Sequence, residues 1–316
     1  MGPEEWRQIF YSLGKAPFWV TISGGEPFLR EDLPDLVGSL YDICRPAIIN
    51  IPTNGLLTKR IPGYVNRIAC HCVDAQIVIN LSIDELDQRH DTIRRIAGNF
   101  DKSLETLRAL KRLEAPNVTV GIHTVISKFN VDRIPDVYRS LLNLGPDSYV
   151  AEIAEAREEL GTTESDIAPS YPAYTKAVDF LTTAQKRTHL DGIGRITRAL
   201  RAEYYQITKR ILKEQTQIIP CYAGFASTHI APNGDVWACC TRAESMGNVR
   251  QNGYNFNRVW FSQEADALRK RIKADQCHCP LANASYTNML FDPKTIFRII
   301  RNYAMNDQTH RTQRTQ

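Results

Sequence analysis

The chain has 316 residues, with 39 Lys and Arg against 35 Asp and Glu and a formal net charge of +4. This charge is too small to indicate nucleic-acid binding, and no apolar run approaches the roughly 18 residues that a membrane-spanning helix needs. The first residues carry no basic segment followed by an apolar stretch, so no signal peptide is predicted. A cytoplasmic location follows, where disulfides are rare, and the eight cysteines need another explanation.

The first half of the chain alternates strands and amphipathic helices. Residues 3–13 predict a helix and residues 17–23 predict a buried strand. Apolar segments that predict further strands recur every 30 to 40 residues or so, at 47–52, 76–84, 117–127 and 148–156. Such βα repeats are typical of a buried parallel sheet. An open doubly wound sheet and a partial or closed barrel both fit the pattern.

The second half has a different composition. After a first domain at residues 1–157, residues 158–215 predict a polar connection followed by helices. Residues 216–290 are cysteine-rich with short strands, and Asn233-Gly234 predicts the turn of a hairpin. Residues 291–316 predict a C-terminal helix and a disordered tail.

Polar residues gather where successive predicted strands end. In both sheet arrangements ligands bind at the carboxyl ends of the strands. The polar strand ends are Ser23 to Glu26, Thr53 to Gly55, Ser82 with Asp84, and Ser127 with Asn130. Each alone fits an ordinary turn, but four in succession predict a shared pocket.

Five of the eight cysteines lie in the last third of the chain, at positions 221, 239, 240, 277 and 279. Thiolates from a hairpin and a tight knuckle can bind zinc or hold an iron–sulfur cluster, and the spacing does not separate the two. Cys44 continues an apolar helical stripe and is predicted to lie in the core. Cys70 and Cys72 are interpreted as structural, with a metal site as the alternative.

The sequence resembles the radical S-adenosylmethionine (SAM) superfamily. The resemblance rests on Ser-Gly-Gly-Glu-Pro at residues 23–27, on residues 79–110 and on residues 120–141. Cys221, seventeen residues and Cys239, with Gly234 followed by four residues and then cysteine, are similar to the Twitch/SPASM auxiliary-cluster domains. The resemblance implies a partial (β/α)6 TIM-like barrel that lacks its first strand, plus a small cysteine-rich α+β auxiliary domain.

The resemblance also implies a SAM site at the strand ends. In the family this segment binds the methionine amino group, and glycines let the backbone approach the ligand. The implied SAM-binding residues are Gly24, Gly25, Glu26, Pro27, Asn54, Ser82 and Asp84. Glu26 is the one for which a backbone-organising role is the alternative. His123 is expected to face the barrel interior, either as a substrate-pocket residue or as a satisfied interior histidine.

One family motif is missing from these residues. The cluster that cleaves SAM is normally held by a C-x3-C-x2-C loop upstream of the Gly-Gly-Glu-Pro segment, and no cysteine here precedes Cys44. We expect that the chain is a truncated form of a complete enzyme, with Met1 an internal methionine. The alternatives are a degenerate module that keeps the barrel and the auxiliary cluster, and a zinc-knuckle α/β binding protein. No catalytic residue is assigned.

The expected ligands of the auxiliary [4Fe–4S] cluster are Cys221, Cys239, Cys277 and Cys279, with Cys240 as an alternate to Cys239. His278 interrupts the usual C-x2-C and could be drawn in as a ligand. A peptide or small-molecule substrate and an electron donor such as flavodoxin or ferredoxin are the partners that the resemblance implies.

Overall fold

The computed structural model describes residues 1–186, 193–274 and 277–313, which fall into two compact units. Unit 1 comprises Met1–Glu152, Pro232–Gly234 and Asn248–Trp260, and unit 2 comprises Ile153–Ala231, Asp235–Gly247 and Phe261–Gln316. The two units therefore interleave along the sequence. The four sequence regions with boundaries at 157, 215 and 290 remain a prediction.

Unit 1 is built on a five-stranded sheet whose strands lie in chain order. The strands are β1 (Trp19–Thr21), β2 (Ile48–Thr53), β3 (Gln76–Ser82), β4 (Val118–Ile126) and β5 (Ser148–Ile153). The β1–β2, β2–β3 and β3–β4 pairs are parallel. A sheet that never reverses its strand order, with a helix after each strand, is the arrangement of a βα barrel rather than of a doubly wound sheet.

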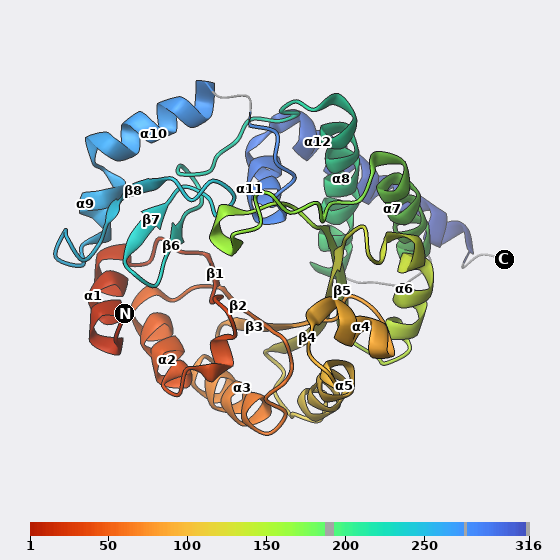
Figure 1. Ribbon diagram of the computed structural model, residues 1–316, viewed down its shortest axis with the longest axis horizontal. Helices are drawn as coiled ribbons and strands as arrows, with labels where there is room; N and C mark the ends of the chain where they lie inside the picture. The colour runs from red at the N-terminus through yellow and green to blue at the C-terminus, as the bar shows by residue number, and fades with distance from the viewer. Residues whose placement is uncertain (187–192, 275–276, 314–316) are drawn as a thin grey trace. The chain divides into compact units, whose positions relative to one another are not determined.

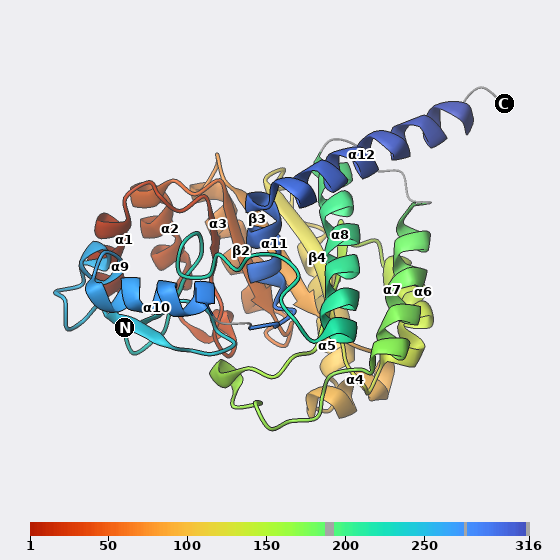
Figure 2. The same cartoon turned by 90° about the horizontal axis from the view of Figure 1, so that it is seen from above.

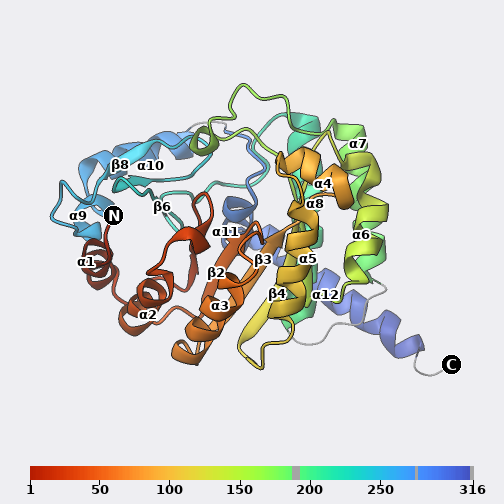
Figure 3. The same ribbon diagram turned by 60° about the horizontal axis from the view of Figure 1, so that its bottom comes forward.

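The helices of unit 1 lie on the outside of the curved sheet, where Figure 1 shows α2, α3 and α5 beside the strands that they follow. Figure 3 shows α3 and α5 across the outer face of β2, β3 and β4. The bounds are α1 (Pro3–Leu13), α2 (Leu33–Cys44), α3 (Arg60–His71), α4 (Asp87–Arg94), α5 (Asn99–Leu110), α6 (Ile134–Leu142) and α9 (Phe256–Trp260). Short 3-10 turns are η1 (Pro27–Leu29) and η2 (Val131–Arg133).

The two faces of the sheet differ in chemistry. Along β2 and β3 the buried side chains alternate with half-buried ones, as the two-residue period of a strand requires. Ile49, Ile51, Ile77 and Ile79 are fully buried on the helix-covered face. Asn50 and Asn80 occupy the alternate, half-buried positions. Helices thus cover one face, and the other carries the polar side chains of Asn50, Asn80 and Ser82 among apolar ones, which confirms the partial barrel.

Strand β1 differs from its prediction. The sequence predicts a buried strand at 17–23, but β1 is only three residues long, with Phe18 69% and Trp19 56% exposed. The reason is its position: β1 is at the end of the strand order and pairs only with β2 among the described residues. An edge strand keeps one side open whatever its apolar content.

Unit 2 contains helices and a small sheet. The helices are α7 (Tyr171–Lys186), α8 (Ile193–Glu214), α10 (Gln263–Ala274), α11 (Ala282–Phe291) and α12 (Pro293–Gln313). Helix α8 contacts α7, α11 and α12, and Figure 2 shows α8 running beside α7. The three-stranded sheet has the order β6 (His229–Ile230), β7 (Asp235–Trp237) and β8 (Ser245–Asn248), and η3 is Glu158–Leu160. Beta strands β6 and β7 are antiparallel, as the hairpin prediction requires.

Helix α12 extends to Gln313, so it includes most of the segment for which the sequence predicts a disordered tail. The remaining tail residues lie outside the described part of the chain. Within the described residues, none of the helices combines the length and the apolar character that spanning a membrane requires.

Candidate functional site

The Gly24-Gly25 turn leaves an open backbone edge after β1. Gly24 has φ +148°, a conformation that residues with a side chain rarely adopt, and both glycines are exposed. A Cβ added at either position would meet no atom within 4 Å. The space beside this backbone is therefore open, and a ligand can approach the peptide groups directly.

Glu26 ties the ends of two strands together. Its Oε1 accepts hydrogen bonds from Thr53 Oγ1 at 2.9 Å and from the Phe28 N–H at 3.2 Å. Its Oε2 accepts from the Asn54 N–H at 2.7 Å. Both carboxylate oxygens are thus engaged, which agrees with a backbone-organising role for Glu26.

The loop after β2 is fixed by its own side chain and by α5. Asn54 Oδ1 accepts from the Leu56 N–H at 2.9 Å and closes a local turn. Ser103 on α5 donates to the Asn54 carbonyl at 2.9 Å, and Thr106 donates to the Gly55 carbonyl at 2.6 Å. Asn54 therefore shapes the loop through both its side chain and its backbone.

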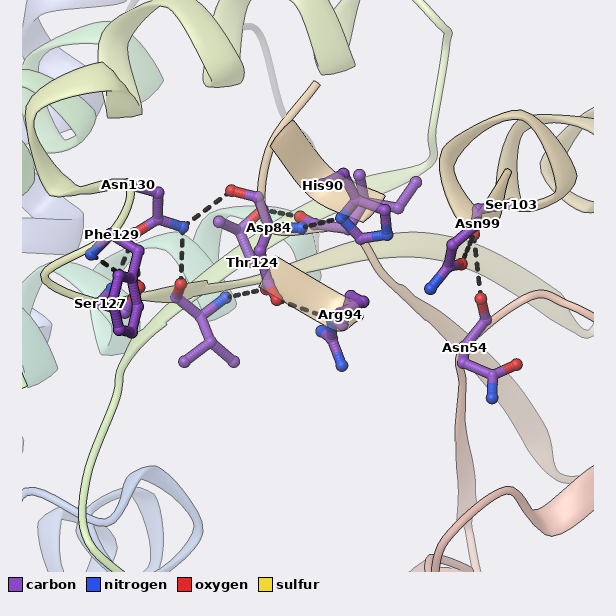
Figure 4. A network of polar contacts seen from close by, with 12 residues as sticks. Asn54, Asp84, His90, Arg94, Asn99, Ser103, Thr124, Ser127, Phe129 and Asn130 are labelled. Atoms are coloured by element: carbon purple, nitrogen blue, oxygen red, sulfur yellow. Dashed lines mark hydrogen bonds and ion pairs between the residues drawn. The ribbon is translucent and has the colours of Figure 1, made fainter. Parts of the chain in front are cut away.

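Asp84 lies buried at the end of β3 and links β3 to β4. One carboxylate oxygen accepts from the Val125 N–H at 2.9 Å, and the other pairs with Arg94 Nε at 2.7 Å. The Asn130 amide donates to the Asp84 carbonyl at 2.8 Å, and the Asp84 N–H donates to His90 Nδ1 at 3.2 Å. Figure 4 shows this network. The Asp84 carboxylate therefore stabilises the fold and does not face an open pocket.

Burial lowers the pKa of His90, against the opposing effect of Asp84. Because Nδ1 accepts a hydrogen bond from a backbone N–H, the ring is neutral with its proton on Nε2. A neutral imidazole is the form that a buried site next to the Asp84–Arg94 ion pair accommodates.

The polar face of the sheet carries a directed row of hydrogen bonds. The Asn80 amide donates to Asn50 Oδ1 at 2.9 Å, and the Asn50 amide donates to Thr21 Oγ1 at 3.3 Å. At the Asn80 end of the row, Asn80 Oδ1 is buried and accepts no hydrogen bond within the described chain. Gly121 lies opposite Asn80, and a Cβ there would be 2.5 Å from Asn80 Oδ1. Ser82 occupies the same face as Asn80, next to His123 on β4.

His123 is half-buried and paired with Glu152 of β5, with 3.2 Å between His123 Nε2 and Glu152 Oε2. Both residues occupy the half-buried alternate positions of their strands. The pair places an acid–base couple beside the amide row. Its partner Glu152 carries no motif and could not be found from local sequence.

Four cysteines of unit 2 come together from three segments of chain. Cys221, Cys277 and Cys279 line one small cavity of about 30 Å³. Cys239 and Cys221 are close enough to Cys277 for their charges to interact. The thiols of Cys277 and Cys279 are hydrogen-bonded to each other. These four cysteines, here called the cysteine group, are the four that the sequence predicts as ligands.

The sulfurs of the cysteine group receive hydrogen bonds from several N–H groups. The Cys221 thiol is contacted by the Ala223 N–H and the Asn288 side chain, and the Cys239 thiol by the N–H groups of Thr241 and Arg242. The pKa values of both thiols are nevertheless raised, because burial outweighs these donors. A cation that binds these half-buried thiols would displace their protons, and the N–H donors would then stabilise the thiolates.

A single metal ion is not what the described residues are arranged to hold. No group of three or more His, Cys, Asp or Glu side chains among them converges on one ion position. Zinc would require its thiolates within about 2.3 Å of one point, whereas a cluster spreads its ligands over several irons. Four cysteine thiols from three segments are a donor set that an iron–sulfur cluster uses.

Cys240 has different neighbours from Cys239. Burial raises its pKa to about 12, and its charged neighbours are Arg157, Glu159 and Glu155. Its thiol hydrogen-bonds Glu159, whose N–H donates to the Cys240 carbonyl at 3.3 Å. Cys240 thus interacts with the segment around η3, for which the sequence predicts only a polar connection.

The remaining cysteines follow their structural interpretation in part. Cys44 and Cys72 are fully buried, and burial raises the pKa of their thiols to about 11 and about 12. Cys70 is exposed and is not a core residue.

Two stretches of the chain match known protein families. Residues 3–141 match the radical SAM superfamily, and residues 221–280 match SPASM, an iron-sulfur cluster-binding domain. The chain therefore carries a radical SAM domain followed by a SPASM domain. These domains use SAM and iron–sulfur clusters as cofactors.

The chain is also similar to individual proteins. It is 22% identical to an AdoMet-dependent heme synthase of Methanosarcina barkeri over 82% of this chain and 71% of that protein. It is 27% identical to mycofactocin maturase MftC of Mycobacterium ulcerans over 77% of this chain and 61% of that protein. Native anSMEcpe with bound AdoMet and Cp18Cys peptide has the same fold, with a TM-score of 0.57, 13% identity and coverage of 100% of this chain and 92% of that chain.

Proposed function

We propose that the chain binds SAM at the strand ends of unit 1 and an auxiliary [4Fe–4S] cluster on the cysteine group of unit 2. It serves the radical modification of a peptide or a small molecule. The observation that carries this proposal is the cysteine group itself: four half-buried thiols from distant segments, with backbone N–H groups directed at the sulfurs of Cys221, Cys239 and Cys279. Small apolar residues would pack at these positions equally well, so packing alone does not account for four cysteines.

The SAM site divides into contacting and supporting residues. Gly24 and Gly25 offer an open backbone edge to the methionine end of SAM. Ser82 lies on the polar face, where it can hydrogen-bond a ligand, and Asn80 lies on the same face with its Oδ1 buried. Glu26, Asn54 and Asp84 support the site through the loops that they hold, since their side chains already have partners.

The relatives and the polar face support two candidate substrate classes. One related solved structure holds a peptide with AdoMet, and one relative is a heme synthase, so both peptides and small molecules are candidates. Bound SAM would supply the hydrogen-abstracting radical of the superfamily if it were reduced by one electron at a cluster whose C-x3-C-x2-C ligands these residues do not include. The His123–Glu152 pair can bind a polar group of the substrate or take up a proton from it. The electron donor we propose is a flavodoxin or a ferredoxin.

Anaerobic reconstitution with iron and sulfide tests the cluster. The chain is expected to bind about four irons with matching sulfide and to absorb visible light. Cys239→Ser removes a ligand and is expected to lower the iron content, whereas its neighbour Cys240→Ser is expected to retain it. Stoichiometric zinc with no iron-dependent absorption would contradict the proposal, as would equal loss of iron in both variants.

SAM binding is a separate measurement. Isothermal titration of the reconstituted chain with SAM is expected to detect binding that Gly25→Val abolishes, because the added side chain fills the open edge. An assay for 5′-deoxyadenosine under reducing conditions then distinguishes a SAM-cleaving enzyme from a module that only binds SAM.

A further inference from the structure

Asn288 lies on α11 with its side chain directed at the cysteine group. The residue is 7% exposed and lines the same small cavity as Cys221, Cys277 and Cys279. A polar side chain at such a position loses its hydration and needs partners in the protein. The partners that it has are both in the Cys221-Tyr222 segment.

The two hydrogen bonds of Asn288 fix the orientation of its amide. Oδ1 accepts from the Tyr222 N–H at 2.7 Å, so it is the oxygen that faces the backbone. The hydrogen bond to the Cys221 thiol then comes from the amide nitrogen. A thiolate can only accept, so this orientation is also the one that a metal-bound Cys221 requires.

The same helix holds the segment at a second point one turn along. The Tyr222 ring packs against Phe291, with 5.1 Å between the ring centroids. Helix α11 therefore contacts both the ring and the N–H of Tyr222, and these contacts fix the position of the adjacent Cys221. Rigid support of this kind fixes the position of a ligand before the cofactor binds.

A hydrogen bond to a cluster sulfur changes the redox properties of the cluster. The reduced cluster carries one more negative charge than the oxidised one, so a donor at the sulfur stabilises the reduced form more strongly. Hydrogen bonds to the sulfurs are among the factors that set the reduction potential of iron–sulfur clusters. Removal of such a donor makes the potential more negative.

We propose that Asn288 is a positioning residue of the auxiliary cluster, which fixes Cys221 through Tyr222 and raises the reduction potential by donating to the Cys221 sulfur. The inference rests on the proposed cluster at the cysteine group. It assigns to one side chain two separable roles, placement of the ligand and adjustment of the potential.

Two variants of Asn288 separate these roles. Asn288→Asp keeps an acceptor for the Tyr222 N–H but presents an oxygen to the sulfur in place of the amide donor. Asn288→Leu removes both hydrogen bonds without adding charge. Asn283→Asp is the matched control, because Asn283 lies on the exposed face of the same helix and undergoes the same chemical change.

The measurements are iron content and midpoint potential of the reconstituted full chain, with folding checked by circular dichroism. Wild type and Asn283→Asp are expected to share one potential. Asn288→Leu and Asn288→Asp are expected to be at least tenfold harder to reduce, which is about 59 mV for a one-electron couple. Faster loss of iron to a chelator is also expected, most of all in Asn288→Leu.

The outcomes distinguish this inference from the assignment of the cluster. A wild-type chain that takes up no iron overturns both. A wild-type cluster together with an unshifted potential in either folded Asn288 variant overturns the role of Asn288 alone. If Asn288→Leu does not fold, Asn288→Asp, which keeps the Tyr222 contact, decides the question by the same potential.

Discussion

At the scale of single residues, the strand-end carboxylates are the feature that most changes the interpretation of the site. Glu26 and Asp84 sit in a region that resembles a SAM pocket, and acidic side chains there suggest contacts to a cationic ligand. In the structure each carboxylate accepts hydrogen bonds from a neighbouring strand or loop. A carboxylate with both oxygens engaged organises a site more than it offers itself to a ligand.

Substitution of Glu26 tests this distinction. Glu26→Gln replaces one acceptor oxygen by an NH2 group, so either the Asn54 N–H or the Thr53 hydroxyl loses its acceptor. We expect the free energy of unfolding to fall by about 1–3 kcal/mol, the cost of an unsatisfied buried group. Glu31→Gln, at an exposed position, is expected to change it by no more than about 0.5 kcal/mol.

Chemical denaturation of the three proteins measures these values, and SAM titration of the same samples separates the two interpretations. An unchanged stability of Glu26→Gln together with lost SAM binding would show that the carboxylate contacts the ligand.

The same residues show what local sequence can predict. The Gly-Gly-Glu-Pro segment and the four cysteines were found because their identity and spacing are local signals. The partners that give them their roles lie far away: Glu26 binds Thr53 and Asn54, and Cys221 is held by Asn288. No pattern in the sequence marks Asn288 or Glu152, because a single Asn or Glu has no periodicity.

At the scale of elements, the apolar repeats predicted the strands and helices of the barrel well, since burial of one face imposes a period. Helix α4 is one of the elements that were not predicted. Its sequence is polar nearly all round, and His90 is its only buried residue in the structure. The helix is held by single contacts, such as the Arg94–Asp84 ion pair, which leave no apolar stripe to detect.

Gly121 in β4 provides a test of the polar face. Its missing Cβ makes room for the Asn80 and Ser148 side chains, each of which would be 2.5 Å from that atom. We expect Gly121→Ala to destabilise unit 1 by about 1–3 kcal/mol, because short side chains held in a sheet cannot move away freely. Displacement of Asn80 should also weaken SAM binding.

Gly63→Ala is the control, with the opposite sign expected. Gly63 is exposed in α3 and a Cβ there meets no atom within 4 Å. Alanine in a helix is favoured over glycine by about 0.5–1 kcal/mol. Thermal unfolding of both variants measures the difference, and a neutral Gly121→Ala would contradict the close packing of Asn80 against β4.

At the scale of the whole molecule, the path of the chain is the feature that the sequence could not predict. Residues 232–234 and 248–260 belong to unit 1, although the regions around them belong to unit 2. Local composition assigns these residues to the cysteine-rich region, because that is where they lie in the sequence. What joins them to α1 is a set of contacts across some 240 positions, such as the Ser12 carbonyl accepting from the Asn257 amide at 2.7 Å.

Glu5 is the centre of that set. It accepts from Arg250 Nε at 2.9 Å, from the Tyr254 hydroxyl at 2.8 Å and from the Gly2 N–H at 2.6 Å. These hydrogen bonds, that of Gly2 first, lower the pKa of Glu5 to about 2 from its ordinary value of 4.5. The ionised carboxylate therefore holds residues 250–254 against the start of α1.

The pH dependence of this contact has a defined sign. Between pH 4.5 and pH 2 the unfolded chain binds a proton at Glu5 that the folded chain does not, so the stabilisation is complete above about pH 4.5 and is lost as the pH falls towards 2. Glu5→Gln removes it at every pH. We expect faster amide hydrogen exchange in Phe256–Trp260 of the variant at neutral pH, while Leu33–Cys44 exchanges as in wild type. Glu4→Gln, in the same first turn, is expected to leave the exchange of both segments unchanged.

The difference in the free energy of unfolding between wild type and Glu5→Gln should shrink steadily below pH 4.5. A difference that is constant down to pH 2 would show that the charge of Glu5 does not hold the segment.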